Sequence, residues 1–117
     1  ERLKQALGDC LAQPVSSPLP ITSLTAALAD ARRVPTHELP QTGVPLEMEH
    51  GLSSPFVSMP ERGYGTRSSL VISVQPSETR VAPAAWRVAV DEWTHAPAAG
   101  HGHAWNPHNR CSETLFW

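Results

Sequence analysis

The sequence predicts an α+β fold, with helices in its first half and an antiparallel sheet in its second half. Up to residue 52 the apolar residues recur three or four positions apart, as in helices, whereas from residue 56 onward they alternate, as in strands. The 117 residues include 12 prolines, about twice the usual share, so each element should be short. We therefore expect one unit that is helical over residues 1–52 and sheet-forming over residues 56–117.

Composition and charge exclude several classes of partner. The formal net charge is -2 and the nine basic residues are scattered, apart from Arg32 and Arg33, so nucleic acid is not an expected partner. No apolar run is long enough for a transmembrane segment, and the first residues do not resemble a signal peptide. Cys10 and Cys111 stand at opposite ends of the chain and provide no disulfide framework, so we expect a cytoplasmic protein.

The first helix is predicted over residues 2–12, where one face is apolar and the opposite face is polar. Gly8 lowers the helix propensity of this segment. The apolar stripe consists of Leu3, Ala6, Leu7, Cys10 and Leu11. Residues 13–20 (QPVSSPLP) then combine prolines with serines, a composition that breaks helices and indicates a surface connection.

A second helix follows this connection. Thr22 or Ser23 is its expected N-cap, because a side-chain hydroxyl can accept a hydrogen bond from the first turn. Arg32 and Arg33 fall in its last turn, where positive charge favours the helix dipole, and Pro35 ends it. The buried stripe of this helix is Leu24, Ala27, Leu28 and Ala31.

The middle of the chain is expected to hold only short elements. Residues 46–52 can form one or two helical turns, which Pro45 opens. Residues 56–59 alternate as in a short strand, and Pro60 ends it. The following residues 61–65 supply a turn built on Gly-Tyr-Gly.

Residues 68–74 (SSLVISV) form the clearest strand of the sequence. One of its faces is wholly apolar, and Val71 adds apolar character to the other, so we expect this strand to be central. The residues of the apolar face are Leu70, Ile72 and Val74. Residues 79–82 are a candidate for the returning partner strand.

Residues 86–93 (WRVAVDEW) fit two elements. Alternate residues are apolar, as in a strand, but Trp86, Val90 and Trp93 also fit one face of a helix. We favour the strand. Residues 112–117 (SETLFW) are expected to form the final strand.

Three stretches occur together in one order: LPQTGVPLEMEHGLSSPFV at residues 39–57, GYGTRSS at residues 63–69, and the apolar strand that follows. They resemble the C-terminal half of the NRDE family, the Transport and Golgi organisation 2-like proteins. In that family a Leu-Pro-x-Thr-Gly segment precedes a Leu-Ser-x-Phe element, and a Tyr-Gly-Thr-Arg-Ser/Thr-Ser turn then enters a strand. The resemblance is closest over residues 39–74, extends over residues 1–38 and weakens over residues 75–109.

The resemblance implies a four-layer αββα sandwich of the N-terminal-nucleophile hydrolase type, with two antiparallel sheets between outer helices. It makes residues 1–117 the C-terminal portion of a single NRDE-type domain, whose partner is the remaining N-terminal part of the same protein. The family's nucleophile is a Cys directly after the initiator Met, followed by an Asn-Arg-Asp-Glu signature, and this chain, which begins with Glu1, has neither. Cys10 is internal and lacks the free α-amino group that serves as base.

We therefore expect a structural portion of an N-terminal-nucleophile-hydrolase-like protein, without independent catalysis. Two alternatives stay open because the resemblance also implies them. One is a Cys-dependent hydrolase of linear amide bonds, formed when the chain is joined to the N-terminal part. The other is a protein of haem or lipid handling and trafficking.

Residues 63–69 are the strongest candidate for a ligand site. A glycine-rich turn with hydroxyls and a guanidinium at its exit can present hydrogen-bond donors to a carboxylate or another anion. The same glycines also permit a tight entry into a strand, and this structural role is the favoured one. The candidate ligand-binding residues are Tyr64, Thr66, Arg67 and Ser68, and a small molecule is the partner they would suit.

Residues 94–109 read as a long loop that is rich in His, Gly, Ala and Pro. Imidazole nitrogens with a nearby thiolate are a ligand set that zinc or haem can use. The spacings match no standard zinc pattern, so we favour a solvated loop and expect no cofactor. The candidate metal ligands are His101, His103, His108 and Cys111.

The four tryptophans of the sequence are also open to two interpretations. Large rings can form an aromatic ligand cage, but in a small protein they more often pack in the core, and we expect the core. These residues are Trp86, Trp93, Trp105 and Trp117.

Overall fold

The computed structural model describes residues 2–14, 21–77, 86–95 and 103–116. Its helices are α1 (Arg2–Leu11), α2 (Ile21–Leu28) and α3 (Leu46–Gly51), with 3-10 turns at Thr36–Glu38 and Pro60–Arg62. Its strands are β1 (Ser58–Met59), β2 (Tyr64–Gly65), β3 (Ser68–Pro76), β4 (Trp86–Thr94) and β5 (Arg110–Phe116). Helices followed by antiparallel strands confirm the predicted α+β class.

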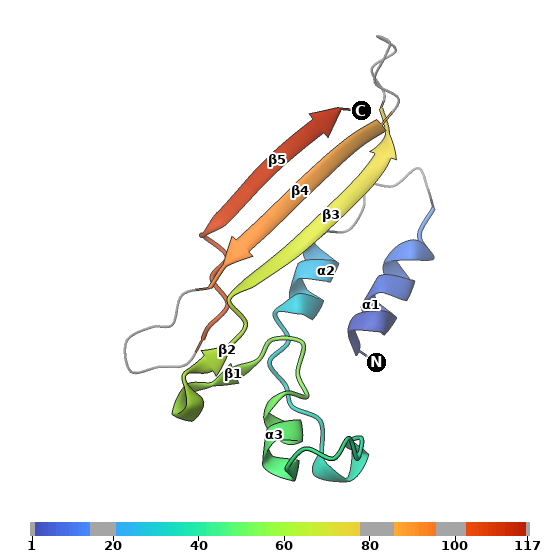
Figure 1. Cartoon of the computed structure of the whole chain (residues 1–117). Helices are drawn as coiled ribbons and strands as arrows, with labels where there is room; N and C mark the ends of the chain where they lie inside the picture. Colours follow the sequence, from blue (N-terminus) through green and yellow to red (C-terminus); the bar gives the residue numbers. More distant parts are fainter. Residues whose placement is uncertain (1, 15–20, 78–85, 96–102, 117) are drawn as a thin grey trace.

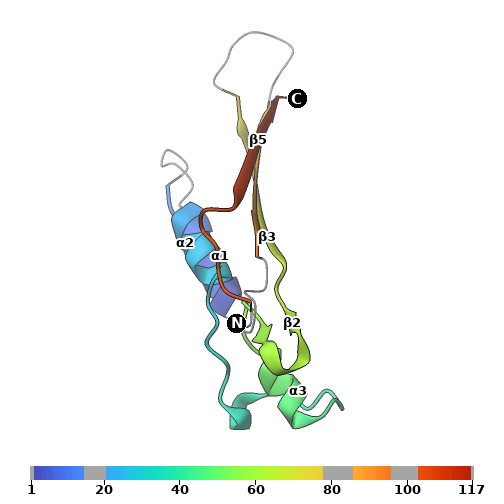
Figure 2. The same ribbon diagram turned by 90° about the vertical axis from the view of Figure 1, so that its left-hand side faces the viewer.

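The main sheet is antiparallel, and helices α1 and α2 lie on one side of it, near β3 (Figure 1). β4 lies between β3 and β5, and β1 pairs with β2 in a separate two-stranded ribbon. In Figure 1 helix α2 lies behind the β3 side of the main sheet and α1 lies farther out, and the edge-on view of Figure 2 shows both of them on the same side. Among the described residues, no helix lies on the opposite face.

The two faces of β3 differ in burial. Ser69 and Val71 point toward the helices and are buried. Leu70, Ile72 and Val74 point the other way and are 50%, 58% and 56% exposed. The predicted alternation is therefore present, but its more apolar face is the uncovered one.

The position of β3 corrects one prediction. Among the residues that the structure describes, β3 is an edge of the three-stranded sheet and β4 is its central strand. Val71 had suggested a strand with neighbours on both sides, because it gives both faces apolar character. β4 and β5 confirm the strands predicted at residues 86–93 and 112–117, whereas the candidate strand at residues 79–82 lies outside the described residues.

The first two helices pack on each other. α1 confirms the helix predicted at residues 2–12, and it buries Cys10. α2 begins at Ile21, so Thr22 and Ser23 lie inside its first turn and the N-cap prediction was wrong. Neither α-helix, nor any other helix in the described ranges, is long and apolar enough to cross a membrane. Both cysteines are free thiols, with Cys10 buried and Cys111 exposed.

The end of α2 also differs from the prediction. The helix ends at Leu28, so Arg32 and Arg33 lie beyond its last turn. Asp30 explains this, because its carboxylate accepts hydrogen bonds from the backbone N–H of Arg32 at 3.0 Å and from the Arg32 guanidinium at 2.9 Å. The hydrogen bonds from Arg32 hold the pKa of the Asp30 carboxyl well below its usual range. The Asp30 carbonyl accepts a further bond from the Phe56 N–H at 3.0 Å, which ties this turn to the sheet region.

The β1–β2 ribbon replaces the simple turn that the Gly-Tyr-Gly sequence predicted. Met59 pairs with Tyr64, and Gly63 turns the chain with a positive φ of 59°. Met59 is buried against Gly51, where an added Cβ would lie 2.6 Å from the Met59 Cε. The ribbon is therefore held against α3. This helix confirms the short helix predicted at residues 46–52.

Candidate functional site

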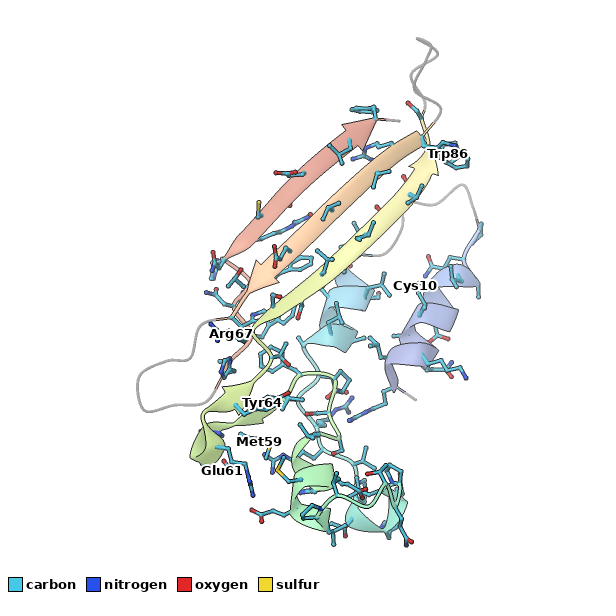
Figure 3. The ribbon with its side chains drawn as sticks, viewed as in Figure 1. Cys10, Met59, Glu61, Tyr64, Arg67 and Trp86 are labelled. Carbon is cyan, nitrogen blue, oxygen red and sulfur yellow. The ribbon has the colours of Figure 1, made fainter. Side chains whose placement is uncertain are left out.

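The candidate site lies where β2 passes into β3, at the end of the main sheet nearest the ribbon (Figure 3). Thr66 fixes this passage: its N–H donates to the Val57 carbonyl at 2.9 Å, and its hydroxyl accepts a bond from the Val57 N–H at 2.9 Å. The Arg67 carbonyl accepts a bond from the His95 N–H at 2.7 Å. The backbone of the predicted site is thus held from two sides, and the Thr66 hydroxyl takes part in the fold.

Three of the four predicted ligand-binding residues present exposed side chains. Tyr64 is 56% exposed, and Arg67 and Ser68 are also exposed. The Arg67 guanidinium has no hydrogen bond or ion pair with another described residue, so only the backbone of Arg67 acts as an anchor. A binding role for these side chains remains a prediction, and their exposure is compatible with it.

His95 is the most deeply buried polar residue beside the turn, with 1% exposure. Its Nδ1 accepts a hydrogen bond from the Asn106 N–H at 3.2 Å, and its Nε2 lies 3.1 Å from the Ser69 hydroxyl. Burial lowers the pKa of His95, and the nearby His103 lowers it further, so the ring is neutral at pH 7. Because Nδ1 accepts, the single proton of the neutral ring resides on Nε2 and is donated to Ser69.

This proton arrangement decides what the His95–Ser69 pair can do chemically. A general base must offer an unprotonated nitrogen to the hydroxyl that it activates. Here the nitrogen facing Ser69 carries the proton, and Ser69 itself is buried at 7% exposure. The pair therefore joins β3 to the end of β4 and does not form an activated serine.

Aromatic rings enclose His95. The Phe56 ring meets the imidazole edge-on with centroids 5.1 Å apart, and the Trp105 ring lies 4.7 Å from it. Trp93 in turn lies 5.8 Å from Trp105. This cluster is part of the described core, since Phe56 and Trp93 are 2% and 5% exposed.

The cluster tests the expectation that the tryptophans fill the core. Trp93 confirms it, and the half-buried Trp105 covers the edge of the cluster. Trp86 contradicts it, because it stands at the start of β4 on the uncovered face and is 48% exposed. Trp117 lies outside the described residues.

His103 packs on the glycine-rich turn. Its Nδ1 lies 3.1 Å from the Thr66 carbonyl, and its ring covers Gly65 so closely that an added Cβ would be 2.5 Å from the imidazole Cδ2. Gly65 is therefore required because an imidazole occupies the space of a side chain. The two glycines of the motif have separate reasons, since Gly63 supplies the positive φ.

The structure places the predicted metal ligands as follows. His103 is engaged with the turn, His108 and Cys111 are exposed, and His101 lies outside the described residues. Within the described ranges, no three His, Cys, Asp or Glu side chains are grouped so that they could hold a metal ion. A metal site that includes His101 remains a prediction.

A second polar cluster lies on the face of the main sheet against which α2 packs. Asp91 is 4% exposed and accepts hydrogen bonds from the Arg110 guanidinium at 2.7 Å and from the Ser112 hydroxyl. The bond from Ser112, followed by Arg110, lowers the pKa of Asp91 against the opposing effect of burial. Arg110 also stacks over Trp93, with its Cζ 5.3 Å from the ring centroid. The cluster links β4 to β5.

Two features of the site escaped the reasoning from sequence. Asp91 was passed over, although an acidic residue at an inward position of a strand is itself a signal that buried partners exist. His95 falls within residues 94–109, which the sequence predicts as a loop. Its place directly after β4 could have marked it as a core residue, because it follows the alternation of Asp91 and Trp93.

Most of the chain is similar to one family of known proteins. The sequence profile of the Transport and Golgi organisation 2 family matches residues 1–82, which hold both helices of the helical layer, the glycine-rich turn and β3. Neither the curated proteins nor the solved structures contain a significant match. The match covers more than half of the chain and agrees with the motifs at residues 39–57 and 63–69, and so the chain belongs to the Transport and Golgi organisation 2 family.

Proposed function

We propose that this chain is the C-terminal structural portion of an N-terminal-nucleophile-hydrolase-like sandwich and that its uncovered sheet face receives a second sheet. The observation that carries the proposal is the burial of β3: its more apolar face, with Leu70, Ile72 and Val74, lies away from the helices (Figure 2). A sheet of a soluble domain normally buries its apolar face. This arrangement supports the proposal that the chain forms one half of a sandwich.

The uncovered face carries apolar residues from all three strands of the sheet. β4 extends the apolar surface of β3, because Val88 and Val90 of β4 pair with Val74 and Ile72 of β3. Leu115 of β5 pairs with Val88 and is 55% exposed. Large contiguous apolar patches on a soluble protein mark a site of association. Fully burying a large apolar side chain stabilises a complex by about 1.5–3 kcal/mol. Because these side chains are about half-exposed, binding of a partner would contribute roughly half of that per residue.

The partner in this proposal is the N-terminal part of the same domain. That part would carry the Cys nucleophile and the Asn-Arg-Asp-Glu signature of the resemblance. The chain described here would contribute the helical layer and one sheet, so hydrolysis of linear amides would require both parts. The exposed side chains of Arg67 and Ser68 stand at one end of the sheet, where they could contact a ligand of the complete domain.

Co-expression tests the proposal. The chain would be produced with an affinity tag beside an untagged N-terminal part of a family member, and copurification would be measured. Ile72→Lys places a charge on the uncovered face, between Leu70 and Val74, and should abolish copurification. Thr114→Lys is the matched control, because Thr114 is exposed on the opposite face of the same sheet. Equal copurification of both variants with the N-terminal part would contradict the proposal.

A further inference from the structure

The free edge of β3 presents a defined set of backbone groups. The His95 N–H donates to the Arg67 carbonyl, and β3 pairs with β4 residue by residue from Ser68 to Pro76. In an antiparallel pair, successive residues direct their N–H and C=O groups alternately toward the partner and away from it. Ser69, Val71 and Ser73 therefore bond to β4, whereas Leu70, Ile72 and Val74 direct their backbone groups away from the sheet.

Helix α1 extends beyond this edge. Figure 1 shows α2 behind the β3 side of the sheet and α1 farther out, past β3 and away from β4. α1 packs on α2, but Leu3 and Leu7 remain 39% and 47% exposed. The two helices are thus displaced past the β3 edge of the sheet (Figure 1), and α1 directs apolar side chains to a place where the described sheet has no strand.

An apolar groove lies between α1, α2 and the edge of β3, which form its walls. The residues that line it are Leu3, Lys4, Leu7, Leu24, Leu28, Leu70, Val71 and Ile72. Lys4 is the one charged residue in this lining. Leu70 and Ile72 belong both to the groove and to the uncovered sheet face, so the two surfaces are continuous.

We infer that a further β-strand pairs with β3 in this groove, beneath α1, and extends the sheet. The row of outward N–H and C=O groups on one wall requires an extended backbone, because a helix or an apolar ligand would leave those groups without partners. The apolar walls require alternating apolar side chains on the strand, and an acidic residue opposite Lys4 would match the charge of the groove.

The inference rests on the proposed function for the source of the strand. Because the groove and the uncovered face are continuous, the N-terminal part that covers the face is also placed to supply the strand. A second copy of the chain could in principle pair edge to edge, β3 against β3. That arrangement would bring two copies of α1 to the same groove, so the N-terminal part is the occupant that we propose.

Two variants of Leu70 distinguish binding through the backbone edge of β3 from binding through the uncovered sheet face. Leu70→Ala and Leu70→Pro both remove the apolar side chain, but only proline also removes an outward N–H, while the ladder to β4 does not use that group. In the co-expression experiment, Leu70→Pro should reduce binding of the N-terminal part about 10-fold more than Leu70→Ala does, as expected for a lost buried hydrogen bond. Equal binding by the two variants would overturn the inference.

Amide hydrogen exchange provides a test that needs no substitution. In the chain alone, the N–H groups of Leu70, Ile72 and Val74 should exchange rapidly, whereas those of Val71 and Ser73 should be protected by β4. In the copurified complex the first three should also become protected. Rapid exchange at these positions in a complex that Ile72→Lys still disrupts would overturn the added strand and leave the proposed function standing. Protection that depends on the concentration of the chain alone would identify a second copy and also overturn the inference.

Discussion

The imidazole of His95 and the hydroxyl of Ser69 lie 3.1 Å apart and join the end of β4 to the start of β3 inside the aromatic cluster. This bond connects the family motif at residues 63–69 to a residue outside the part that the family profile matches. The turn is therefore shaped by contacts from the later strands as well as by its own glycines.

Removal of the Ser69 hydroxyl should destabilise the chain. Ser69→Ala leaves the Nε2 proton of His95 buried without an acceptor, which costs about 1–3 kcal/mol. The free energy of unfolding, measured by urea denaturation at pH 7.5, checks this value. Ser68→Ala is the control, because the exposed neighbour should change the stability by less than about 0.5 kcal/mol. Similar losses in the two variants would show that the His95 bond is not the cause.

Stability should fall as the pH is lowered below about 6.5, the ordinary pKa of histidine. The pKa of His95 is lower in the folded chain than in the unfolded chain, so the unfolded chain takes up the proton first and is favoured by acid. The loss should level off below the folded pKa. The lowered pKa values of Asp30 and Asp91 keep both carboxylates ionised through this range. Urea denaturation between pH 7.5 and 5 should show a smaller slope in His95→Gln than in the natural chain.

Gly65→Ala should destabilise the passage from β2 to β3. The new Cβ would lie 2.5 Å from the His103 ring, so the imidazole must move from its place over the turn, at a cost of about 1–3 kcal/mol. Thermal unfolding followed by circular dichroism measures the loss. Gly8→Ala is the matched comparison in α1, where an added Cβ meets nothing within 4 Å, and it should stabilise the helix by up to about 1 kcal/mol.

Asp91→Asn should weaken the link between β4 and β5. The amide keeps the shape of the carboxylate but loses the charge that Arg110 and Ser112 contact. The expected loss of stability is only about 1–2 kcal/mol, because the half-exposed Arg110 is partly screened by solvent. Glu92→Gln, on an exposed neighbour in the same strand, should be almost neutral. The urea midpoints of unfolding of the two variants are compared, and Asp91→Asn should have the lower one. Equal midpoints would count against a stabilising role for the buried cluster.

Much of the local structure could be predicted because it depends on residues close in sequence. The helix α1, the short helix α3, the strand β5 and the motif at residues 63–69 were predicted from the sequence, and β4 was the favoured of two interpretations of residues 86–93. The start and end of α2 were not, because the end depends on Asp30, whose carbonyl is bonded to Phe56 and whose carboxylate captures Arg32. Ser69 and Asp91 were missed as partners because their contacts come from strands paired with their own.

The sequence by itself determined the fold class and the family, since alternation, helical spacing and a short motif are properties of neighbouring residues. Tertiary structure alone decided which face of β3 is covered, that β3 is an edge strand, and that His95 donates to Ser69. The physical reason is that burial and the position of a proton depend on which distant segments come together. The same apolar alternation fits either face of a sheet until the helices occupy one of them.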